Sequence, residues 1–247
     1  LLALGAAWAN TPAEAAANQE AILTMVGYPQ DVEDVYFGAQ GIFTTAEQGM
    51  YVIDLTTSEP MLAKRIYDEA KTRGIQSFDA PVSGGDLGAQ QGTLSIMLGG
   101  DENKVEAIMP LLQTFGKNIV YQGAAGAGQH AKMCNQIVVA SSMIGVCESM
   151  AYAKHAGLSP ETVLQSITAG AAGSWALSNL APRMLAGDDA PGFYIKHFVK
   201  DMGIALKECA QMNLQLPGLQ LANKMYNELV EQGYGDCGTQ ALYHYYE

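Results

Sequence analysis

The sequence predicts an α/β domain with a largely parallel sheet, followed by an all-helical domain. Short apolar runs alternate with helical segments over the first half of the 247-residue chain, and no convincing strand follows residue 120. Strands that alternate with helices are typical of βαβ units, whose strands run parallel. We therefore expect an α/β domain over residues 1–123 and a helical domain over residues 124–247.

Five short apolar runs are expected to form the strands. The first, residues 21–26, is almost continuously apolar, as in a strand that is buried on both faces. The other runs cover residues 51–55, 77–82, 93–98 and 118–121. Between the second and third runs, residues 59–73 predict a helix, with Pro60 near its first turn and Gly74 just after its end.

The second half is expected to be helical throughout. Residues 128–157 predict a long helix that is buried nearly all round, because this segment is apolar and poor in charge. Further helices are expected over residues 159–168, 177–186, 199–213 and 219–232. Lys200 and Asp201 open the helix at 199–213, where a solvated ion pair is the simplest interpretation of the two side chains.

The composition argues against several classes of partner. The formal net charge is -12, with 25 acidic and 13 basic side chains, so the surface repels phosphate backbones and no nucleic acid partner is expected. No run of about 20 residues is free of polar groups, so no membrane span is expected. The cysteines and histidines show no metal-binding spacing, which favours free thiols in a reducing cytosol and no metal.

Three expected strands end in segments that could contact a ligand, because open α/β sheets bind ligands at the carboxyl ends of their strands. The first strand runs into Val26-Gly27-Tyr28-Pro29. The turn Ser83-Gly84-Gly85 allows positive φ angles, so its amides can point at an anion. An ordinary tight loop is the alternative, and the turn alone favours it. In residues 56–58, Thr57 can cap the next helix, contact a ligand, or do both.

Lys132 is the most informative residue of the long helix. It lies near the helix start, where the helix dipole disfavours a cation, and it precedes the uncharged segment 137–146. A buried ammonium group is costly unless it has a partner or a chemical role. Asn135 and Gln136 share its helix face, so the three side chains can form a polar site for a hydroxy acid. A lysine that extends its ammonium group to the surface is the alternative.

The chain resembles the β-hydroxyacid dehydrogenase family in the order and spacing of several motifs. These motifs are Asp79-Ala80-Pro81-Val82-Ser83-Gly84-Gly85, Gly92-Thr93-Leu94 with Gly99-Gly100, Gly126-Ala127-Gly128 with Lys132 and Asn135, and Lys200-Asp201. The resemblance implies a Rossmann-type dinucleotide-binding domain, an all-α domain, and NAD or NADP as cofactor. The family begins with a GxGxxG unit, so at least one βαβ unit, roughly 30 residues or more, is expected upstream.

The resemblance also implies roles for individual residues. Lys132 corresponds to the catalytic lysine, which would act as a general acid and base on a small β-hydroxy acid. The implied substrate contacts are Ser83, Gly84, Gly85, Asn135, Gln136, Phe193 and Asp201, the last as the partner of Lys200. The implied cofactor contacts are Val26, Gly27, Asp31, Thr57 and Lys200, and Asp31 departs from the asparagine of the relatives. Which of the two carboxamides binds substrate is left open.

The implied protein is a cytoplasmic homodimer or homotetramer, assembled through the helical domain, that acts on a small anionic hydroxy acid or semialdehyde. An imine reductase on the same scaffold is an alternative, although such enzymes generally lack the lysine at position 132. A sugar-phosphate substrate is disfavoured because few cations are available to bind phosphate. A non-catalytic dimerisation or binding module is the alternative from another functional class.

Overall fold

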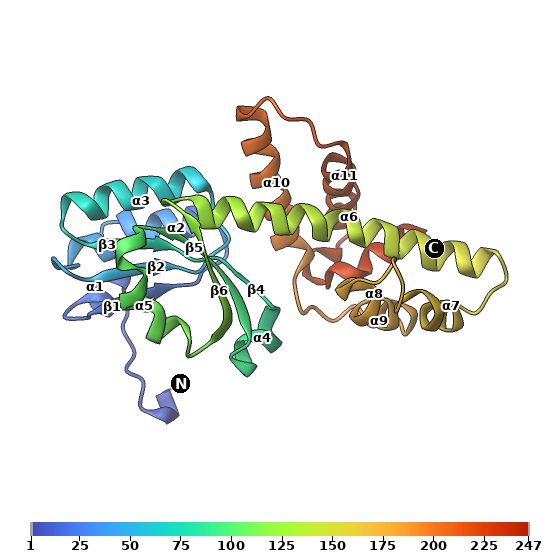
Figure 1. Ribbon diagram of the computed structural model, residues 1–247, viewed down its shortest axis with the longest axis horizontal. Helices are drawn as coiled ribbons and strands as arrows, with labels where there is room; N and C mark the ends of the chain where they lie inside the picture. Colours follow the sequence, from blue (N-terminus) through green and yellow to red (C-terminus); the bar gives the residue numbers. More distant parts are fainter. Residues whose placement is uncertain (1, 247) are drawn as a thin grey trace. The chain divides into compact units, whose positions relative to one another are not determined.

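The computed structural model describes residues 2–246 and divides into two compact units. The first is an α/β unit, Leu1–Lys132, and the second is a helical unit, Met133–Glu247. Figure 1 shows that the strands belong to the first unit and that the second consists of helices and their connections. The division falls within one long helix, whereas the functional boundary expected after residue 123 stays a prediction.

The α/β unit contains a six-stranded mixed sheet. Its strands are β1 (Ala21–Thr24), β2 (Tyr51–Asp54), β3 (Gln76–Asp79), β4 (Val82–Ser83), β5 (Leu94–Gly100) and β6 (Gly116–Gly123). β1, β2 and β3 are parallel, β5 runs antiparallel to β3 and β4, and β6 is parallel to β5. The expected parallel arrangement is therefore correct for β1–β3 but not across the β3–β5 pair.

Two expected strands differ from those of the structure. The run at residues 77–82 is split into β3 and β4, because Pro81 has no N–H group for the ladder, although its carbonyl oxygen accepts the N–H of Met97 at 3.0 Å. The expectation that residues 21–26 are buried on both faces is wrong. Leu23 is 38% exposed and Met25 is 62% exposed, so this segment is not covered on both faces.

Alternating side chains on β2 place helices on both faces of the sheet. Val52 packs with residues of α2 (Pro29–Phe37) and α3 (Pro60–Thr72), whereas the next residue, Ile53, packs with α5 (Val105–Leu112). Figure 1 shows these helices on opposite sides of the strands. The remaining helices are α1 (Pro12–Ala16) and α4 (Gly85–Gln91). α3 matches the helix expected at residues 59–73. The sequence analysis did not expect α2, α4 or α5.

The helical unit is built around aromatic and methionine side chains. Its helices are α6 (Ala127–His155), which begins in the α/β unit, α7 (Pro160–Ile167), α8 (Trp175–Asn179), α9 (Ala181–Leu185), α10 (Ile195–Gln211), α11 (Pro217–Glu231) and the 3-10 helices η4 (Tyr234–Asp236) and η5 (Thr239–Tyr246). Phe198 packs edge-on against Tyr226 with ring centroids 5.1 Å apart, and Met143 and Met150 of α6 join this core. The helix expected at 177–186 is instead two helices, because Pro182 starts a new one.

α6 is buried on one side only, so the expectation of burial nearly all round is wrong. An exposed stripe at intervals of three and four residues consists of Cys134, Val138, Ser141, Gly145, Glu148 and Tyr152. By length and composition alone α6 could cross a membrane, but half of its most apolar window is buried inside the protein. The core helix of a soluble protein has the same properties, so this is a weak indication of a span.

The start of α6 lies directly against the sheet. A Cβ atom at Gly128 would overlap the carbonyl oxygens of Met97 and Asp79, and one at Gly99 would lie 2.6 Å from Oδ1 of Asp79. The helix therefore approaches β3 and β5 as closely as two backbones can, and only glycine fits at these two positions.

We expect Gly128→Ala to lower the free energy of unfolding. Overpacking against two carbonyl groups costs about 1–3 kcal/mol, more than the roughly 1 kcal/mol that alanine gains over glycine in a helix. The matched control is Gly145→Ala, in the same helix with open space around it, which should raise the free energy by about 0.5–1 kcal/mol. Chemical denaturation measures both, and equal effects would contradict the close approach at Gly128.

Candidate active site

The ammonium group of Lys132 is buried beside the Ser83-Gly84-Gly85 turn. Lys132 is 7% exposed, and its Nζ donates a hydrogen bond to the carbonyl oxygen of Val82 at 2.8 Å. Val82 directly precedes Ser83 in β4. The alternative in which this lysine extends its ammonium group to the surface is therefore wrong.

The Ser83-Gly84-Gly85 turn has the conformation that its glycines predict. The φ angles of Gly84 and Gly85 are +130° and +64°, a region that favours glycine. Ser83 is half-buried and pairs with Ser95 across the β4–β5 ladder. The turn therefore begins from a fixed strand and leads directly into α4, while its role in binding an anion stays a prediction.

Asp79, the last residue of β3, caps the start of α6. Its Oδ1 accepts the N–H of Gly126 at 2.7 Å and its Oδ2 accepts the N–H of Gln129 at 2.9 Å. Burial raises the pKa of the Asp79 carboxyl above its ordinary value, and the amides of Gly126, Gln129 and Gly128 oppose this rise. The first amide hydrogens of a helix have no partner within it, so a strand residue remote in sequence supplies one here.

Gln129 connects the same helix start to the end of β2. It is fully buried; its Oε1 accepts the N–H of Ser58 at 3.0 Å and its Nε2 donates to the carbonyl oxygen of Thr56 at 2.7 Å. The hydroxyl of Thr56 in turn accepts the N–H of Val26 at 3.0 Å. The ends of β1 and β2 and the start of α6 are therefore linked through hydrogen bonds that are buried or partly buried.

The sequence reasoning missed both Asp79 and Gln129 as site residues. Gln129 precedes Lys132 by three residues and so shares its helix face, which is a signal that the sequence contains. Asp79 ends a strand that leads into the Ser83-Gly84-Gly85 turn, but nothing local indicates that its carboxyl group reaches residues 126–129.

Three of the expected cofactor contacts lie at the carboxyl ends of parallel strands. Val26 and Gly27 follow β1 and Thr57 follows β2, and all three are half-buried and uncharged. Open α/β sheets bind ligands outside the carboxyl ends of their strands, so these positions are consistent with the expected cofactor contacts, which stay a prediction. Glu59 occupies the N-cap position of α3 and makes no side-chain cap hydrogen bond. The role of Thr57, as a cap or as a ligand contact, stays a prediction.

Asp31 has a local structural role. Its side chain is exposed, and its Oδ2 accepts the N–H of Tyr28 at 2.9 Å in the first turn of α2. An acidic residue at this position stabilises the positive end of the helix. Its expected contact with the cofactor stays a prediction.

A buried chain of polar groups lies in the helical unit. Nε2 of Gln136 donates to Oδ2 of Asp201 at 2.6 Å, and Nδ2 of Asn135 donates to Oε1 of Gln136 at 2.7 Å. Nζ of Lys200 lies 3.1 Å from Oδ1 of Asp201, and Asp201 is 1% exposed. The solvated ion pair expected here is therefore wrong: α10 begins at Ile195, which puts the pair in its second turn and inside the protein.

Phe193, the expected wall of the substrate pocket, packs into the core of the helical unit. Its ring meets Phe198 edge-on with centroids 5.5 Å apart, and it is half-buried. The carbonyl oxygen of Phe193 accepts the N–H of Thr239. The structure thus fixes its position, and its contact with substrate stays a prediction.

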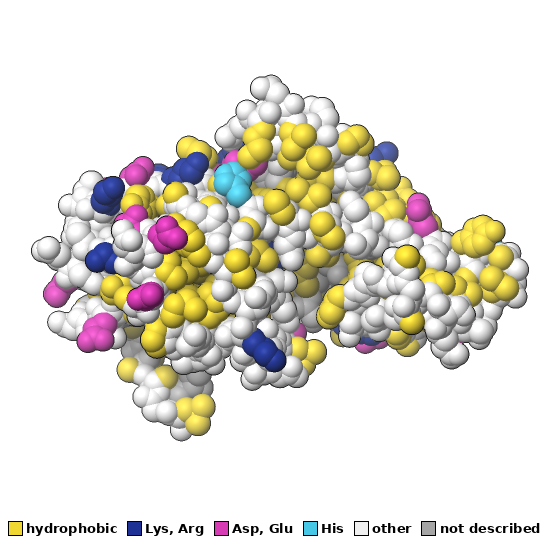
Figure 2. Space-filling model, viewed as in Figure 1, with side chains coloured by type: hydrophobic (Ala, Val, Ile, Leu, Met, Phe, Trp, Pro, Cys, Tyr) yellow, Lys and Arg dark blue, Asp and Glu magenta, His cyan; other side chains and the backbone are white. Residues whose placement is uncertain are grey.

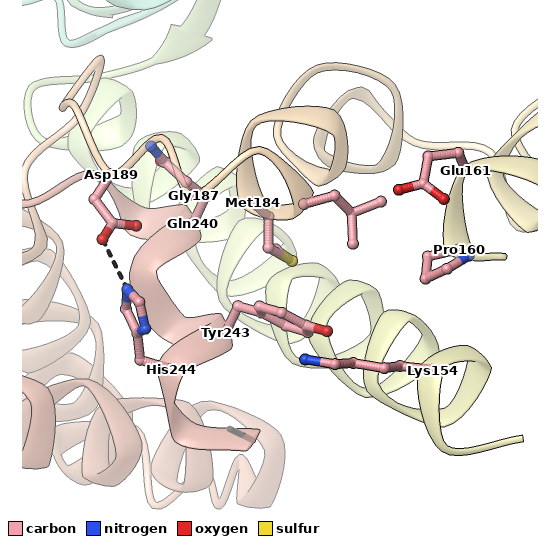
Figure 3. Close-up of a pocket in the computed structure, with 10 residues that line it drawn as sticks. Lys154, Pro160, Glu161, Met184, Gly187, Asp189, Gln240, Tyr243 and His244 are labelled. Atoms are coloured by element: carbon pink, nitrogen blue, oxygen red, sulfur yellow. Dashed lines mark hydrogen bonds and ion pairs between the residues drawn. The ribbon is translucent and has the colours of Figure 1, made fainter. Parts of the chain in front are cut away.

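A pocket of about 340 Å³ lies elsewhere in the helical unit. Figure 3 shows Lys154 and Tyr243 extending toward one another across it, and His244 bonded to Asp189 with Nε2 and Oδ2 2.7 Å apart. No residue expected to contact substrate or cofactor lines this pocket. It therefore does not mark the candidate active site.

The remaining chemical groups of the described chain offer no second candidate centre. Within residues 2–246, no cluster of His, Cys, Asp and Glu side chains is arranged to hold a metal ion, and the four cysteines are free thiols. Figure 2 shows acidic and basic side chains interspersed among apolar ones on the visible face. The ammonium group of Lys132, bonded to the Val82 carbonyl oxygen, stays the candidate centre.

Comparison with known proteins identifies the class. Residues 1–123 match the family described as the NAD binding domain of 6-phosphogluconate dehydrogenase, and residues 126–246 match the NAD-binding domain of NADP-dependent 3-hydroxyisobutyrate dehydrogenase. An uncharacterized oxidoreductase of Bacillus subtilis is 57% identical, over 98% of this chain and 84% of its own. A probable mitochondrial 3-hydroxyisobutyrate dehydrogenase-like protein of Arabidopsis thaliana is 46% identical, over 98% and 72%.

A solved structure agrees with these matches. The 3-hydroxyisobutyrate dehydrogenase of Mycobacterium tuberculosis, determined with L-serine, superimposes with a TM-score of 0.90 at 30% identity, over 99% of this chain and 85% of its own. Fold and matches together define an NAD(P)-dependent dehydrogenase with a Rossmann-type domain followed by a helical domain. The chain belongs to the β-hydroxyacid dehydrogenase family, which includes 3-hydroxyisobutyrate dehydrogenase.

We expect His197, in α10 beside Lys200, to make the protein less stable in acid. Burial, then repulsion from Lys200 and Lys196, lowers the pKa of His197 below its ordinary value of 6.5, against the attraction of Asp201 and Asp236. The unfolded chain therefore takes up the proton more readily, so stability is retained above the unfolded-state pKa and lost as pH falls through the folded one.

The test is urea denaturation of the wild type and His197→Gln at about pH 7.5 and about pH 5.5. The wild type should lose more of its free energy of unfolding on acidification than the variant does. If both proteins lose the same amount, His197 does not contribute to the acid sensitivity.

Proposed function

We propose that this protein interconverts a small β-hydroxy acid and its semialdehyde or keto acid, with Lys132 as the general acid and base. The buried Nζ of Lys132, 2.8 Å from the Val82 carbonyl oxygen, is the observation that supports this proposal. An ammonium group held away from water beside a turn of left-handed glycines is costly, and a proton-transfer role at that place explains why it is kept.

In this proposal the protein supplies position and proton transfer. When bound, NAD or NADP supplies the hydride chemistry. In the direction of reduction, Nζ of Lys132 donates a proton to the oxygen that becomes the hydroxyl, and in oxidation it accepts that proton. Val26, Gly27 and Thr57 would hold the nicotinamide end of the cofactor, since they are half-buried and uncharged at the carboxyl ends of β1 and β2.

The substrate carboxylate would bind at the Ser83-Gly84-Gly85 turn. A protein with a formal net charge of -12 repels small anions, so local donors must overcome that repulsion. The hydroxyl of Ser83 and the amides of the following glycines are such donors, close in sequence to the carbonyl that holds Lys132. A carboxylate therefore fits this turn better than a neutral group does.

The helical unit would contribute the other contacts. Asn135 or Gln136 would bind the substrate, Phe193 would limit its size, and Lys200, held by Asp201, would contact the cofactor, as Asp31 would in the α/β unit. The hydrogen bonds from Asn135 through Gln136 to Asp201 fix these side chains in advance. We further propose that the enzyme works in the cytoplasm as a homodimer or homotetramer through the helical unit.

Lys132→Ala in the full-length enzyme should lower kcat by about 10²–10⁴-fold, the usual contribution of a general acid or base. The dissociation constant of the nucleotide, measured by fluorescence quenching, should stay nearly unchanged. Lys104→Ala, an exposed lysine of the same unit, is the matched control and should keep full turnover. Near-normal turnover by the Lys132 variant would rule out the proposed role.

The substrate should be recognised through its carboxylate. We expect turnover with a member of the panel 3-hydroxyisobutyrate, tartronate semialdehyde, succinic semialdehyde, glyoxylate and L-serine, and none with a cyclic imine. Ser83→Ala should raise KM for the best acid about tenfold or more, the loss of a hydrogen bond to a charged group. The corresponding alcohol without a carboxylate should react poorly and be insensitive to this substitution; equal effects on both would contradict carboxylate binding at Ser83.

A further inference from the structure

Two segments of the α/β unit, residues 79–82 and residues 126–132, are connected to each other at both ends. Asp79 at one end of the first segment binds the amides of Gly126 and Gln129, and Val82 at its other end accepts the hydrogen bond from Lys132. Val82 follows Asp79 by three positions, and Lys132 follows Gln129 by three. The position of the ammonium group therefore depends on where the carboxyl group of Asp79 fixes the helix.

The side chain of Gln129 forms a further connection, between α6 and the segment that follows β2. It faces the same side of α6 as Lys132, and its carboxamide bonds the backbone on both sides of Thr57, at Ser58 and Thr56. These two hydrogen bonds hold this face of α6 against the end of β2. The side chains of Asp79 and Gln129 are buried, at 3% and 0% exposure, so water does not replace these bonds readily.

Close contacts with the surrounding backbone also fix the position of the start of α6. Gly99 and Gly128 are in contact with the Asp79 carboxyl group or its backbone, and neither position has room for a Cβ atom. A buried carboxyl group with two defined acceptor oxygens therefore selects both the first residue of α6 and its distance from β3. A neutral or shorter side chain cannot accept both amides in the same geometry.

We propose that Asp79 and Gln129 are positioning residues for Lys132: they fix the start and rotation of α6 and so place the Lys132 ammonium group beside the Val82 carbonyl. This inference rests on the proposed function, because it assumes that Lys132 transfers the proton. Neither residue needs to touch the substrate. A displacement of about 1 Å at a reacting group can cost on the order of 100-fold in rate, so these connections matter for turnover as well as for stability.

The test is a double-mutant cycle in the full-length enzyme. Asp79→Asn is introduced into the wild type, which retains Lys132, and into the Lys132→Ala variant. Turnover of the Lys132→Ala forms is measured with and without added ethylamine, a diffusible amine that does not depend on the position of α6. Beside Lys132, Asp79→Asn should lower kcat by roughly 10–100-fold. In the amine-supplemented Lys132→Ala background, its effect should shrink to about twofold or less, because there is no tethered ammonium group left to misplace.

Gln129→Met, which keeps the length of the side chain and removes both of its hydrogen bonds, is carried through the same cycle. It provides the second test if Asp79→Asn fails to fold, as judged by circular dichroism and thermal denaturation. A fold-loss that shrinks once the lysine is removed, in either cycle, supports the proposal. The same fold-loss in both backgrounds, or unchanged kcat beside Lys132, overturns it.

The two hypotheses fail in different ways. If Lys132→Ala alone keeps near-wild-type turnover, the proposed role of Lys132 is wrong whatever Asp79 does. If Lys132→Ala loses turnover and added ethylamine restores part of it, but the Asp79 and Gln129 variants lower turnover by the same factor with and without the lysine, the role of Lys132 stands and the positioning inference is wrong.

Discussion

The carboxyl group of Asp79, held by the amides of Gly126 and Gln129, is the interaction on which the rest of the α/β unit's chemistry depends. It satisfies amide hydrogens that an isolated helix would leave to water, and it does so from the end of a strand. The start of α6 is thereby defined by the sheet. Lys132, one turn further along the helix, can then be buried against the carbonyl oxygen of Val82.

The buried face of α6 is polar near its start and apolar further along, and the two parts have different roles. Its buried face begins with the polar side chains Gln129, Lys132 and Gln136 and continues with apolar ones such as Met143 and Met150. The polar part is satisfied by hydrogen bonds to strand ends or to Asp201, whereas the apolar part builds the core of the helical unit. A single continuous helix thus provides both the chemical groups and the scaffold that holds them.

The sequence was sufficient for features that depend on local pattern. The alternation of strands and helices and the helix at α3 follow from periodicity and capping residues, whereas the sequence left open whether Lys132 is buried or reaches the surface. The positive φ angles at Gly84 and Gly85 also follow from residue type. Family resemblance added the class of reaction, which no local pattern contains.

Features that depend on contacts remote in sequence were missed. Asp79 lies 47 and 50 positions before the two residues whose amides it binds, and no local rule joins them. The reversal of β5 relative to β3 and β4 occurs in the segment between β4 and β5, which contains α4. The exposed stripe on α6 could not be read from composition, because Val138 and Tyr152 are apolar or aromatic and yet 65% and 76% exposed.

The close approach at Gly99 and Gly128 has a consequence for anyone who wishes to redesign this enzyme. Neither position has room for a side chain, so the backbone contact between Gly99 and Gly128 must stay unchanged. Substitutions, whether natural or introduced by directed evolution, are therefore restricted to residues on the other side of the site. On the proposed function, new substrate preferences would be sought at Ser83 or Phe193, which are both only half-buried. The amine of Lys132 would then keep its place while the shape around it is varied.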